Sequence, residues 1–354
     1  MKIAVILGTR PEIIKMSPII RECRKKKLNY FTLHTGQHYS HEMDRIFFEE
    51  LELPLPDFNL DVGSGTHAEQ TGKIMTGVEK ILMREGPDVV LVQGDTNTVL
   101  AGALAAAKLH IKIGHVEAGL RSFDRSMPEE INRIVADHIS DYLFAPTENA
   151  RNNLLKEGIE EDKISVTGNT IVDSVYQNRE IAERKVNVLK DLGLVSKEYF
   201  LVTAHRAENV DNSNRLKEIL KGLELIGSEF SLPTVFPVHP RTRKMVKKFG
   251  LQFDGIRAIE PVGFLEFLQL EGNARLALTD SGGVQEETCI LGVPCVTLRD
   301  NTERPETLQV GSNMLVGADS QQIREGVLRM MTQGNRWSNP FGDGQAGQMI
   351  IECL

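Results

Sequence analysis

Residues 275–287, RLALTDSGGVQEE, predict a strand that ends in a tight glycine turn and is followed by the first turn of a helix. A helix that begins at Ser281 or Gly282 leaves its first backbone N–H groups unpaired, with the positive end of the helix dipole behind them. Such an end favours an anion. We expect Gly282 and Gly283 to let the backbone approach a phosphate closely and to adopt a turn that a side chain would forbid.

Glu287 lies about one helical turn beyond Gly283, roughly 6 Å along the same face of the predicted helix. An anion site with a carboxylate one turn away suits a nucleoside diphosphate and its ribose hydroxyls. The structural alternative is a Gly-Gly turn followed by a solvated, acidic first helical turn. The stretch by itself leaves both interpretations open.

The composition indicates a globular protein of two domains. The 354 residues suffice for two domains of roughly 100–200 residues each. The net charge of −8 argues against broad nucleic-acid binding, which needs a basic field. The four cysteines contain no C-x-x-C pair and predict buried thiols in a reducing compartment. We see no signal peptide and no apolar run near the roughly 18 residues of a membrane span, so we expect a soluble, cytoplasmic protein without a membrane partner.

Short β-branched runs alternate with amphipathic helical segments along the whole chain, which predicts an α/β fold with parallel sheets and crossover helices. The charged helical segment 168–197 separates two such series and is the expected connection between domains. The strands of the first series are predicted at residues 3–7, 31–35, 88–95, 111–117, 142–145 and 164–167. Those of the second are predicted at residues 199–203, 234–238, 256–259, 275–279 and 294–298. Two doubly wound, Rossmann-like domains follow from this outline.

Polar side chains gather just beyond the ends of the predicted strands, where doubly wound sheets bind ligands. In the first series they are Arg10, Lys15, Asp95, Glu117, Arg121, Glu129 and Arg133. In the second they are His205, Arg206, His239, Arg241 and the Ser-Gly-Gly turn. Individually, Asp95 could cap a helix and Glu129 could simply favour a helix N-terminus. Together they predict one cleft between the domains, with a carboxylate cluster on the first and a phosphate site on the second.

The spacing of His34, His38 and His41 could suggest a metal site. However, it crosses a strand end and a turn, and no cysteine or aspartate joins the three histidines. We therefore predict no metal. The apolar stripe that follows is predicted to belong to the core and consists of Phe47, Phe48, Leu51 and Leu53.

Several motifs, taken in order, resemble those of the UDP-N-acetylglucosamine 2-epimerases of the non-hydrolysing bacterial and archaeal kind. They are Gly8-Thr-Arg-Pro-Glu12 with Lys15, Gln93-Gly-Asp95, Gly114-His-Val-Glu-Ala-Gly-Leu-Arg121, Pro128-Glu-Glu with Asn132-Arg133, Thr167-Gly-Asn169, His205-Arg206, residues 280–287, Arg299-Asp300 with residues 302–306, and Gly342-Asp-Gly-Gln-Ala346. The resemblance covers nearly the whole chain.

The resemblance implies a glycosyltransferase-B-like architecture and a homodimer. Residues 1–168 with the C-terminal helix 343–354 would form the domain with the acid/base cluster, and residues 169–342 the UDP-binding domain. The implied reaction interconverts UDP-N-acetylglucosamine and UDP-N-acetylmannosamine, with no cofactor, by elimination of UDP to 2-acetamidoglucal and re-addition. Its product commonly serves polysaccharide biosynthesis.

The family's catalytic positions match Asp95, Glu117, Glu129 and His205. The implied substrate-binding residues are Arg10, Lys15, Arg133, Arg206, His239, Ser281, Gly282, Gly283 and Glu287. Among these, Glu287 would bind the ribose, and Arg10, Lys15 and Arg133 would hold either the diphosphate or the charged cluster. The segments 39–45 and 65–70 depart from the regulatory substrate site of bacterial members, which leaves allosteric activation open. Three alternatives also remain: a hydrolysing epimerase that releases UDP and N-acetylmannosamine, a UDP-sugar glycosyltransferase of the same fold, and a non-catalytic UDP-sugar sensor.

Overall fold

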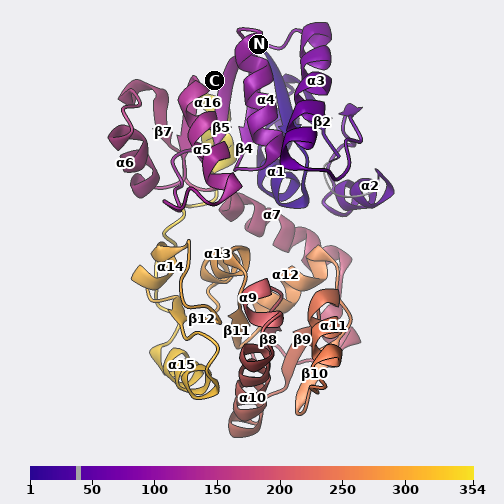
Figure 1. The fold of residues 1–354 in the computed structure, drawn as a ribbon, viewed down its shortest axis with the longest axis vertical. Helices are drawn as coiled ribbons and strands as arrows, with labels where there is room; N and C mark the ends of the chain where they lie inside the picture. Colours follow the sequence, from indigo (N-terminus) through magenta and orange to yellow (C-terminus); the bar gives the residue numbers. More distant parts are fainter. Residues whose placement is uncertain (37–40) are drawn as a thin grey trace. The chain divides into compact units, whose positions relative to one another are not determined.

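The computed structural model describes residues 1–36 and 41–354, with the side chains of residues 41–44 outside that description. The chain forms two compact units (Figure 1). Unit 1 consists of Met1–Gln177 and Phe341–Leu354, and unit 2 of Asn178–Pro340.

The boundary between the units falls inside the helix α7 (Thr170–Lys185), rather than at the predicted position after residue 168. The physical reason is a carboxylate near the start of this helix. Asp173 accepts the backbone N–H groups of Ala346 at 3.2 Å and Gly347 at 2.9 Å, so the first turns of α7 belong to unit 1.

Unit 1 contains a parallel sheet of seven strands in the order β3-β2-β1-β4-β5-β6-β7. The strands are β1 (Lys2–Leu7), β2 (Asn29–His34), β3 (Phe58–Asn59), β4 (Val89–Gln93), β5 (Lys112–Val116), β6 (Tyr142–Ala145) and β7 (Ile164–Val166). The six predicted strands are confirmed, and the two-residue edge strand β3 is an addition. Every residue of β4 is buried, as its continuous apolar sequence requires for a central parallel strand.

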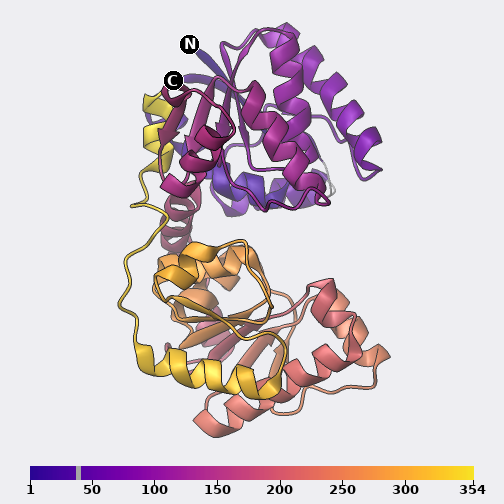
Figure 2. The same ribbon diagram turned by 60° about the vertical axis from the view of Figure 1, so that its left-hand side comes forward.

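Helices cover both faces of this sheet (Figures 1 and 2). Besides α7, they are α1 (Arg10–Lys25), α2 (His41–Glu50), α3 (His67–Glu85), α4 (Asn97–Lys108), α5 (Pro128–Ile139), α6 (Glu148–Lys156), the short 3₁₀ helix η1 (Glu161–Lys163) and α16 (Ala346–Glu352). The core on one face joins α3, α4 and α5 to the strands through buried side chains such as Val78, Val99 and Ala136. α1 packs against α16, so the end of the chain completes unit 1.

Unit 2 repeats the plan with six parallel strands in the order β10-β9-β8-β11-β12-β13. They are β8 (Phe200–Thr203), β9 (Thr234–Pro237), β10 (Ile256–Ile259), β11 (Leu276–Thr279), β12 (Cys295–Thr297) and β13 (Asn313–Leu315). The helices are α8 (Val188–Asp191), α9 (Ala207–Val210), α10 (Ser213–Phe230), α11 (Pro240–Lys248), α12 (Phe264–Asn273), α13 (Gly282–Leu291), α14 (Pro305–Gln309) and α15 (Ser320–Gln333). The five predicted strands are confirmed, and β13 was not predicted.

In both sheets the strand order reverses next to the first strand of the unit. The reversal lies between β1 and β4 in unit 1 and between β8 and β11 in unit 2. Loops that leave neighbouring strands at such a point diverge to opposite faces and leave a crevice at the carboxyl ends of the strands. The predicted site residues should therefore lie in the loops after these four strands and β5.

The structure also tests the predictions for the apolar stripe, the cysteines and membrane-spanning helices. Phe47, Phe48, Leu51 and Leu53 are all buried, which confirms the predicted core stripe. The prediction of four buried thiols is wrong for Cys353, which is exposed because it lies at the end of the last helix, whereas the other three cysteines are buried and free. Among the described residues, no helix combines the length and the apolar character needed to cross a membrane.

The predicted histidine group can be followed only in part. His34 ends β2, is buried, and makes an edge-to-face contact with the Phe48 ring at 6.0 Å. His38 and the His41 side chain lie outside the described residues.

Candidate functional site

The loop after β4 places Asp95 in a cluster of charged groups. Its backbone carbonyl accepts a hydrogen bond of 2.8 Å from Asn132 in α5, and its carboxylate forms an ion pair with the Arg133 guanidinium. Arg133 also donates to Glu130 at 2.8 Å. Burial opposes the charge of Glu130, but backbone N–H groups and Arg133 lower its pKa, so that it stays ionised. Arg133, predicted to hold either the diphosphate or the charged cluster, therefore belongs to the cluster in this structure.

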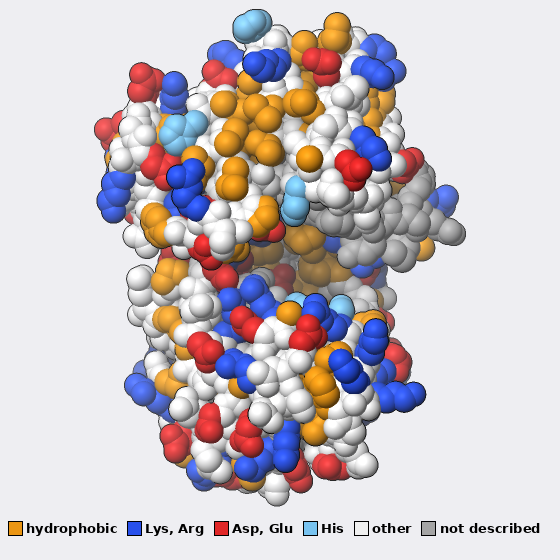
Figure 3. Space-filling model, in the orientation of Figure 1, with side chains coloured by type: hydrophobic (Ala, Val, Ile, Leu, Met, Phe, Trp, Pro, Cys, Tyr) orange, Lys and Arg blue, Asp and Glu red, His pale blue; other side chains and the backbone are white. Residues whose placement is uncertain are grey.

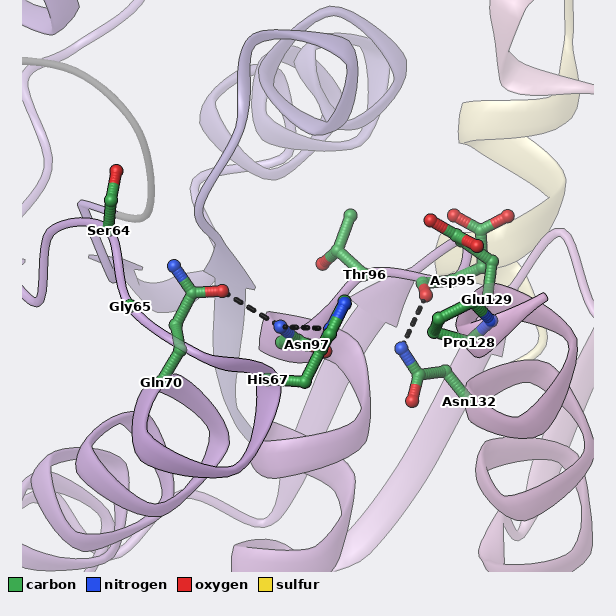
Figure 4. A pocket seen from close by; sticks show the side chains of 10 residues that line it. All are labelled: Ser64, Gly65, His67, Gln70, Asp95, Thr96, Asn97, Pro128, Glu129 and Asn132. Atoms are coloured by element: carbon green, nitrogen blue, oxygen red, sulfur yellow. Dashed lines mark hydrogen bonds between the residues drawn. The ribbon is translucent and has the colours of Figure 1, made fainter. Parts of the chain in front are cut away.

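Asp95 and Glu129 lie at one end of a pocket of about 390 Å³ in unit 1 (Figure 4). Their carboxyl groups point toward the same end of this pocket, from the loop after β4 and from the first turn of α5. The remaining lining mixes polar and apolar surface and comes from Ser64, Gly65, His67, Gln70, Thr96, Asn97, Pro128 and Asn132. The pocket thus places two acidic side chains next to hydrogen-bonding groups such as Gln70 and Asn97.

Glu117 follows β5 and adopts a left-handed conformation with φ +67°, which costs a non-glycine residue about 1–2 kcal/mol. Its carboxylate is almost fully buried and accepts hydrogen bonds from Lys15 at 2.6 Å, Asn169 at 3.1 Å and Gln93. Backbone strain of this kind is often found at functional sites, where the surrounding contacts over-determine it. These contacts fix the orientation of the Glu117 carboxylate, and Lys15 is the cation that pairs with it.

The separate parts of the acidic cluster are close together in unit 1. A Cβ atom added to Gly94 would lie 3.8 Å from Glu117 Oε2, so the Glu117 carboxylate sits beside the residue that precedes Asp95. The structure therefore brings Asp95, Glu117 and Glu129 to one sheet edge. Arg10 begins α1, and its guanidinium lies over the Phe47 ring at 5.3 Å.

A further carboxyl group, Glu12, lies beneath this edge. It is 2 % exposed, and it accepts the Gly8 backbone N–H at 2.9 Å and the Thr96 hydroxyl at 2.7 Å. Burial raises its pKa to about 7, against the opposing effect of these hydrogen bonds. Glu12 thus connects the loop after β1 with the loop after β4.

The raised pKa of Glu12 predicts a pH dependence of stability. In the unfolded chain Glu12 ionises near pH 4.5, whereas in the folded chain it ionises near pH 7. The folded state is therefore favoured below pH 4.5, and that advantage, on the order of 3 kcal/mol, is lost as the pH rises to about 7. We expect Glu12→Gln to gain stability relative to wild type from pH 5 to pH 7.5, measured by thermal unfolding. The exposed Glu148→Gln is the control, and a Glu12→Gln difference that is constant with pH contradicts the assignment.

In unit 2, Asp280 organises the loops after β8 and β11. Its buried carboxylate accepts the backbone N–H groups of His205 at 3.0 Å and Arg206 at 2.9 Å, and the Asn209 amide at 3.1 Å. His205 Nδ1 lies 3.3 Å from Asp280 Oδ1. The backbone and the imidazole of His205 are therefore held by one residue, while 42 % of the side chain stays accessible.

A second pocket, of about 190 Å³, adjoins these loops. It is lined by Thr203, Ala204, His205, Pro237, His239, Pro261, Val262, Phe267, Ser281 and Val284. The rings of His205 and His239 lie 5.7 Å apart. Partial burial, followed by the proximity of His205 and Arg241, lowers the pKa of His239, which favours its neutral form. Apolar walls with a few polar groups at the rim suit a flat, neutral ring such as a nucleobase.

The helix α13 begins beside this pocket, with Ser281 as its N-cap. The first N–H groups of a helix have no intrahelical acceptor, which makes this end an anion site in the sense predicted. One part of the prediction is wrong. Gly282 and Gly283 lie in the first turn of the helix without a left-handed φ, and a Cβ atom on either would meet its nearest neighbour at 3.9 Å. The turn itself therefore tolerates a side chain, because its backbone is ordinary helix.

This geometry separates folding from ligand binding at Gly283. We expect Gly283→Ala to leave the thermal midpoint unchanged or slightly raised, because alanine favours helix and has room. If a phosphate approaches the backbone here, the added methyl group should weaken UDP binding by at least about tenfold, or roughly 1.4 kcal/mol. Isothermal titration calorimetry with UDP measures this effect. The control is Gly292→Ala at the other end of α13, and unchanged UDP affinity in Gly283→Ala contradicts the phosphate contact.

Glu287, one turn into α13, faces a second carboxyl group. Glu271 of α12 is fully buried beside it. Burial and the neighbouring Glu287 raise the pKa of Glu271 well above its ordinary value, which favours a protonated Glu271. The oxygens of the Glu287 side chain can accept hydrogen bonds from ribose hydroxyls.

Sequence reasoning missed the supporting residues of both clusters. Gln93, Asn169 and Asp280 all lie in motifs that the sequence displayed, but the pattern gave no reason to assign them a contact. For Gln93 and Asp280, the available signal was a polar residue directly at the end of a buried strand, since such a side chain needs partners.

Residues 21–354 match the family model described as UDP-N-acetylglucosamine 2-epimerase. The chain is 59 % identical to the UDP-N-acetylglucosamine 2-epimerase of Methanocaldococcus jannaschii, with 100 % of this chain and 99 % of the relative covered. It superimposes with a TM-score of 0.87, at 60 % identity and 99 % coverage of each chain, on a crystal structure of the M. jannaschii enzyme in complex with UDP-GlcNAc and UDP. It is also 44 % identical, over 100 % of this chain and 99 % of the relative, to a UDP-2,3-diacetamido-2,3-dideoxy-D-glucuronate 2-epimerase of Pseudomonas aeruginosa.

Proposed function

Since this chain belongs to the UDP-N-acetylglucosamine 2-epimerase family, we propose that it inverts C2 of UDP-N-acetylglucosamine to give UDP-N-acetylmannosamine, and the reverse, without releasing UDP. The observation that carries the proposal is the pair of loop clusters at the two topological switch points. One offers a helix N-terminus beside a nucleobase-sized pocket, and the other offers three carboxylates.

Unit 2 would hold the UDP. The N-terminus of α13 provides the backbone donors of Ser281, Gly282 and Gly283 for a phosphate, and Glu287 accepts from the ribose. The pocket with His239 would take the uracil ring, and Arg206 would add positive charge near the diphosphate. His205 is held by Asp280 with its ring partly accessible, which suits a group that contacts the leaving diphosphate.

Unit 1 would supply the acid/base groups. The C2 proton is not adjacent to a carbonyl, so its direct removal is costly; elimination of UDP from C1 develops positive charge on the ring and gives 2-acetamidoglucal. Carboxylates can stabilise this charge and accept the proton. UDP then re-adds to C1, and C2 receives a proton on the opposite face. Asp95, Glu117 and Glu129 are the groups that we assign to these steps, with Lys15, Arg10 and Arg133 as the cations of the cluster.

Proton NMR of the purified protein with UDP-N-acetylglucosamine in D₂O tests the proposal. We expect UDP-N-acetylmannosamine to appear, with deuterium at C2 of the recovered nucleotide sugars. Accumulation of free UDP and N-acetylmannosamine would instead show a hydrolysing epimerase. If UDP-N-acetylglucosamine stays unchanged alone and is consumed only after an acceptor is added, the protein is a glycosyltransferase. If the protein binds UDP-N-acetylglucosamine but catalyses no exchange at C2, it is a UDP-sugar sensor.

The identity of the sugar needs its own comparison, because a relative at 44 % identity is named for a diacetamido uronate. The relative at 59 % identity is named for UDP-N-acetylglucosamine, and we propose that substrate. Rates of C2 exchange with the two UDP-sugars, measured side by side, decide between them. A higher kcat/KM for the diacetamido uronate would overturn the assignment and leave the reaction class intact.

We also propose that the protein is a cytoplasmic homodimer. Three buried free thiols accord with a reducing compartment. On unit 1, hydrophobic side chains gather over α4 and α5, and Ile131 is 47 % exposed there (Figure 3). Light scattering coupled to size-exclusion chromatography should give twice the 39.5 kDa chain mass.

A further inference from the structure

His115 lies in β5, two residues before Glu117, and is fully buried. Its Nδ1 is 2.6 Å from Asp137 Oδ1 in α5, and its Nε2 is 2.8 Å from the Gly94 carbonyl oxygen. A carboxylate and a carbonyl can only accept hydrogen bonds, so both ring nitrogens must donate. His115 is therefore an imidazolium, and although burial opposes the charge, Asp137 and the Gly94 carbonyl raise its pKa.

Asp137 extends this interaction to the turn that follows β5. Its Oδ2 accepts the Gly119 backbone N–H at 3.1 Å and lies 2.7 Å from the Arg121 guanidinium. Arg121 in turn pairs with Glu157 at 2.7 Å. Burial raises the pKa of Asp137, but His115 and Arg121 lower it by more, so the pKa lies below its ordinary value. The positive charges of His115 and Arg121 thus balance the negative charges of Asp137 and Glu157. The group that faces His115 from α5 is therefore an ionised carboxylate.

The two backbone groups that this pair holds flank the catalytic carboxylates of the proposed reaction. Gly94 directly precedes Asp95, and Gly119 follows Glu117 by two residues. Both glycines adopt left-handed φ angles, +85° and +79°, so each marks a sharp turn of the chain. We propose that the His115–Asp137 ion pair is a positioning device that fixes the spacing of Asp95 and Glu117 by holding the turn after β4 and the turn after β5.

This inference rests on the proposed function, because it assigns a role to residues that do not touch the substrate. A displacement of about 1 Å in a catalytic group can lower the rate about 100-fold. If the ion pair were purely structural, its removal would lower stability and leave the turnover of the folded protein unchanged. The value of kcat for the folded variant therefore distinguishes a positioning role from a structural role.

The test compares Asp137→Asn with a matched control, Asp141→Asn. Asp141 also accepts a backbone N–H of β5, that of Ile113 at 2.9 Å, but at the opposite end of the strand. We expect Asp137→Asn to lower kcat about 100-fold, with KM and the Kd for UDP within about threefold of wild type. Asp141→Asn should keep kcat within about twofold. Equal kcat values for the two folded variants would overturn the proposal.

Two measurements keep the inference testable if Asp137→Asn folds poorly or the wild type shows no epimerase activity. Long-range ¹H–¹⁵N spectra of the wild type should show His115 protonated at both nitrogens at pH 8, and a neutral ring would overturn the proposal. In Asp137→Asn, backbone amide shifts should concentrate at residues 94–96 and 117–119, whereas shifts spread evenly over unit 1 would contradict the bracing role. Absence of C2 exchange in the wild type would count against the proposed function alone.

Discussion

Replacement of Glu117 by glutamine is expected to lower kcat for C2 exchange by about 10³-fold while UDP affinity changes by less than about threefold. The substitution removes the charge and keeps nearly the same volume. Lys15 then faces a neutral amide at the position where it now pairs with a carboxylate at 2.6 Å. UDP binding should persist because the proposed UDP contacts belong to unit 2.

Calorimetry with UDP and NMR of C2 deuteration measure the two effects of Glu117→Gln separately. Glu148→Gln is the matched control, since this glutamate of the same unit has a side chain 70 % exposed on α6. Turnover near the wild-type value in Glu117→Gln would show that the acidic cluster is misassigned. Loss of UDP binding together with turnover would show that the variant disturbs more than the proton transfer.

Gly119→Ala should be a strongly destabilising single-methyl change near the site. A Cβ atom at this position would lie 2.2 Å from the Ala150 carbonyl oxygen, and φ is +79°. The obstacle is backbone, which cannot rotate away as a side chain can. Overpacking and the left-handed conformation together should reduce the free energy of unfolding by about 3–5 kcal/mol. Thermal unfolding should show a fall in the midpoint of roughly 10 °C.

Gly158→Ala separates the two causes of that effect. Gly158 has a similar φ of +85°, but an added Cβ would have no heavy atom within 4 Å among the described residues. It should therefore lose only the conformational part, about 1 kcal/mol. Equal destabilisation by the two alanines would refute the steric explanation for Gly119.

The central strands of both sheets were predictable because each is a buried apolar run bounded by polar or glycine turns. The edge strands β3 and β13 were not, since neither contains the β-branched residues that mark most of the other short strands. The boundary between the units lies inside the segment 168–197 that was predicted to connect them, but nine residues beyond the predicted limit at residue 168. Its position within the continuous helix α7 depends on the contact of Asp173 with the backbone of residues 346 and 347, which no local pattern contains.

For the candidate site, the sequence indicated which polar residues gather at the strand ends, because parallel strands bring their carboxyl ends to one edge. It could not indicate how they pair. Arg133 was predicted to contact either the diphosphate or the charged cluster, and it pairs with Asp95. The Gly-Gly turn was predicted to need a conformation forbidden to other residues, yet it is ordinary helix. Pairing and backbone conformation depend on tertiary contacts that no local pattern contains.

The return of the chain to unit 1 affects how the protein can fold during synthesis. α16 packs against α1, and Gly347 lies so close to Pro18 that an added Cβ would be 3.0 Å from the Pro18 Cβ. A ribosome therefore completes all of unit 2 before it releases the segment that covers α1. Until α16 has been synthesised, the first 177 residues lack the segment that packs on α1, so unit 1 cannot complete its packing before the whole of unit 2 has been made.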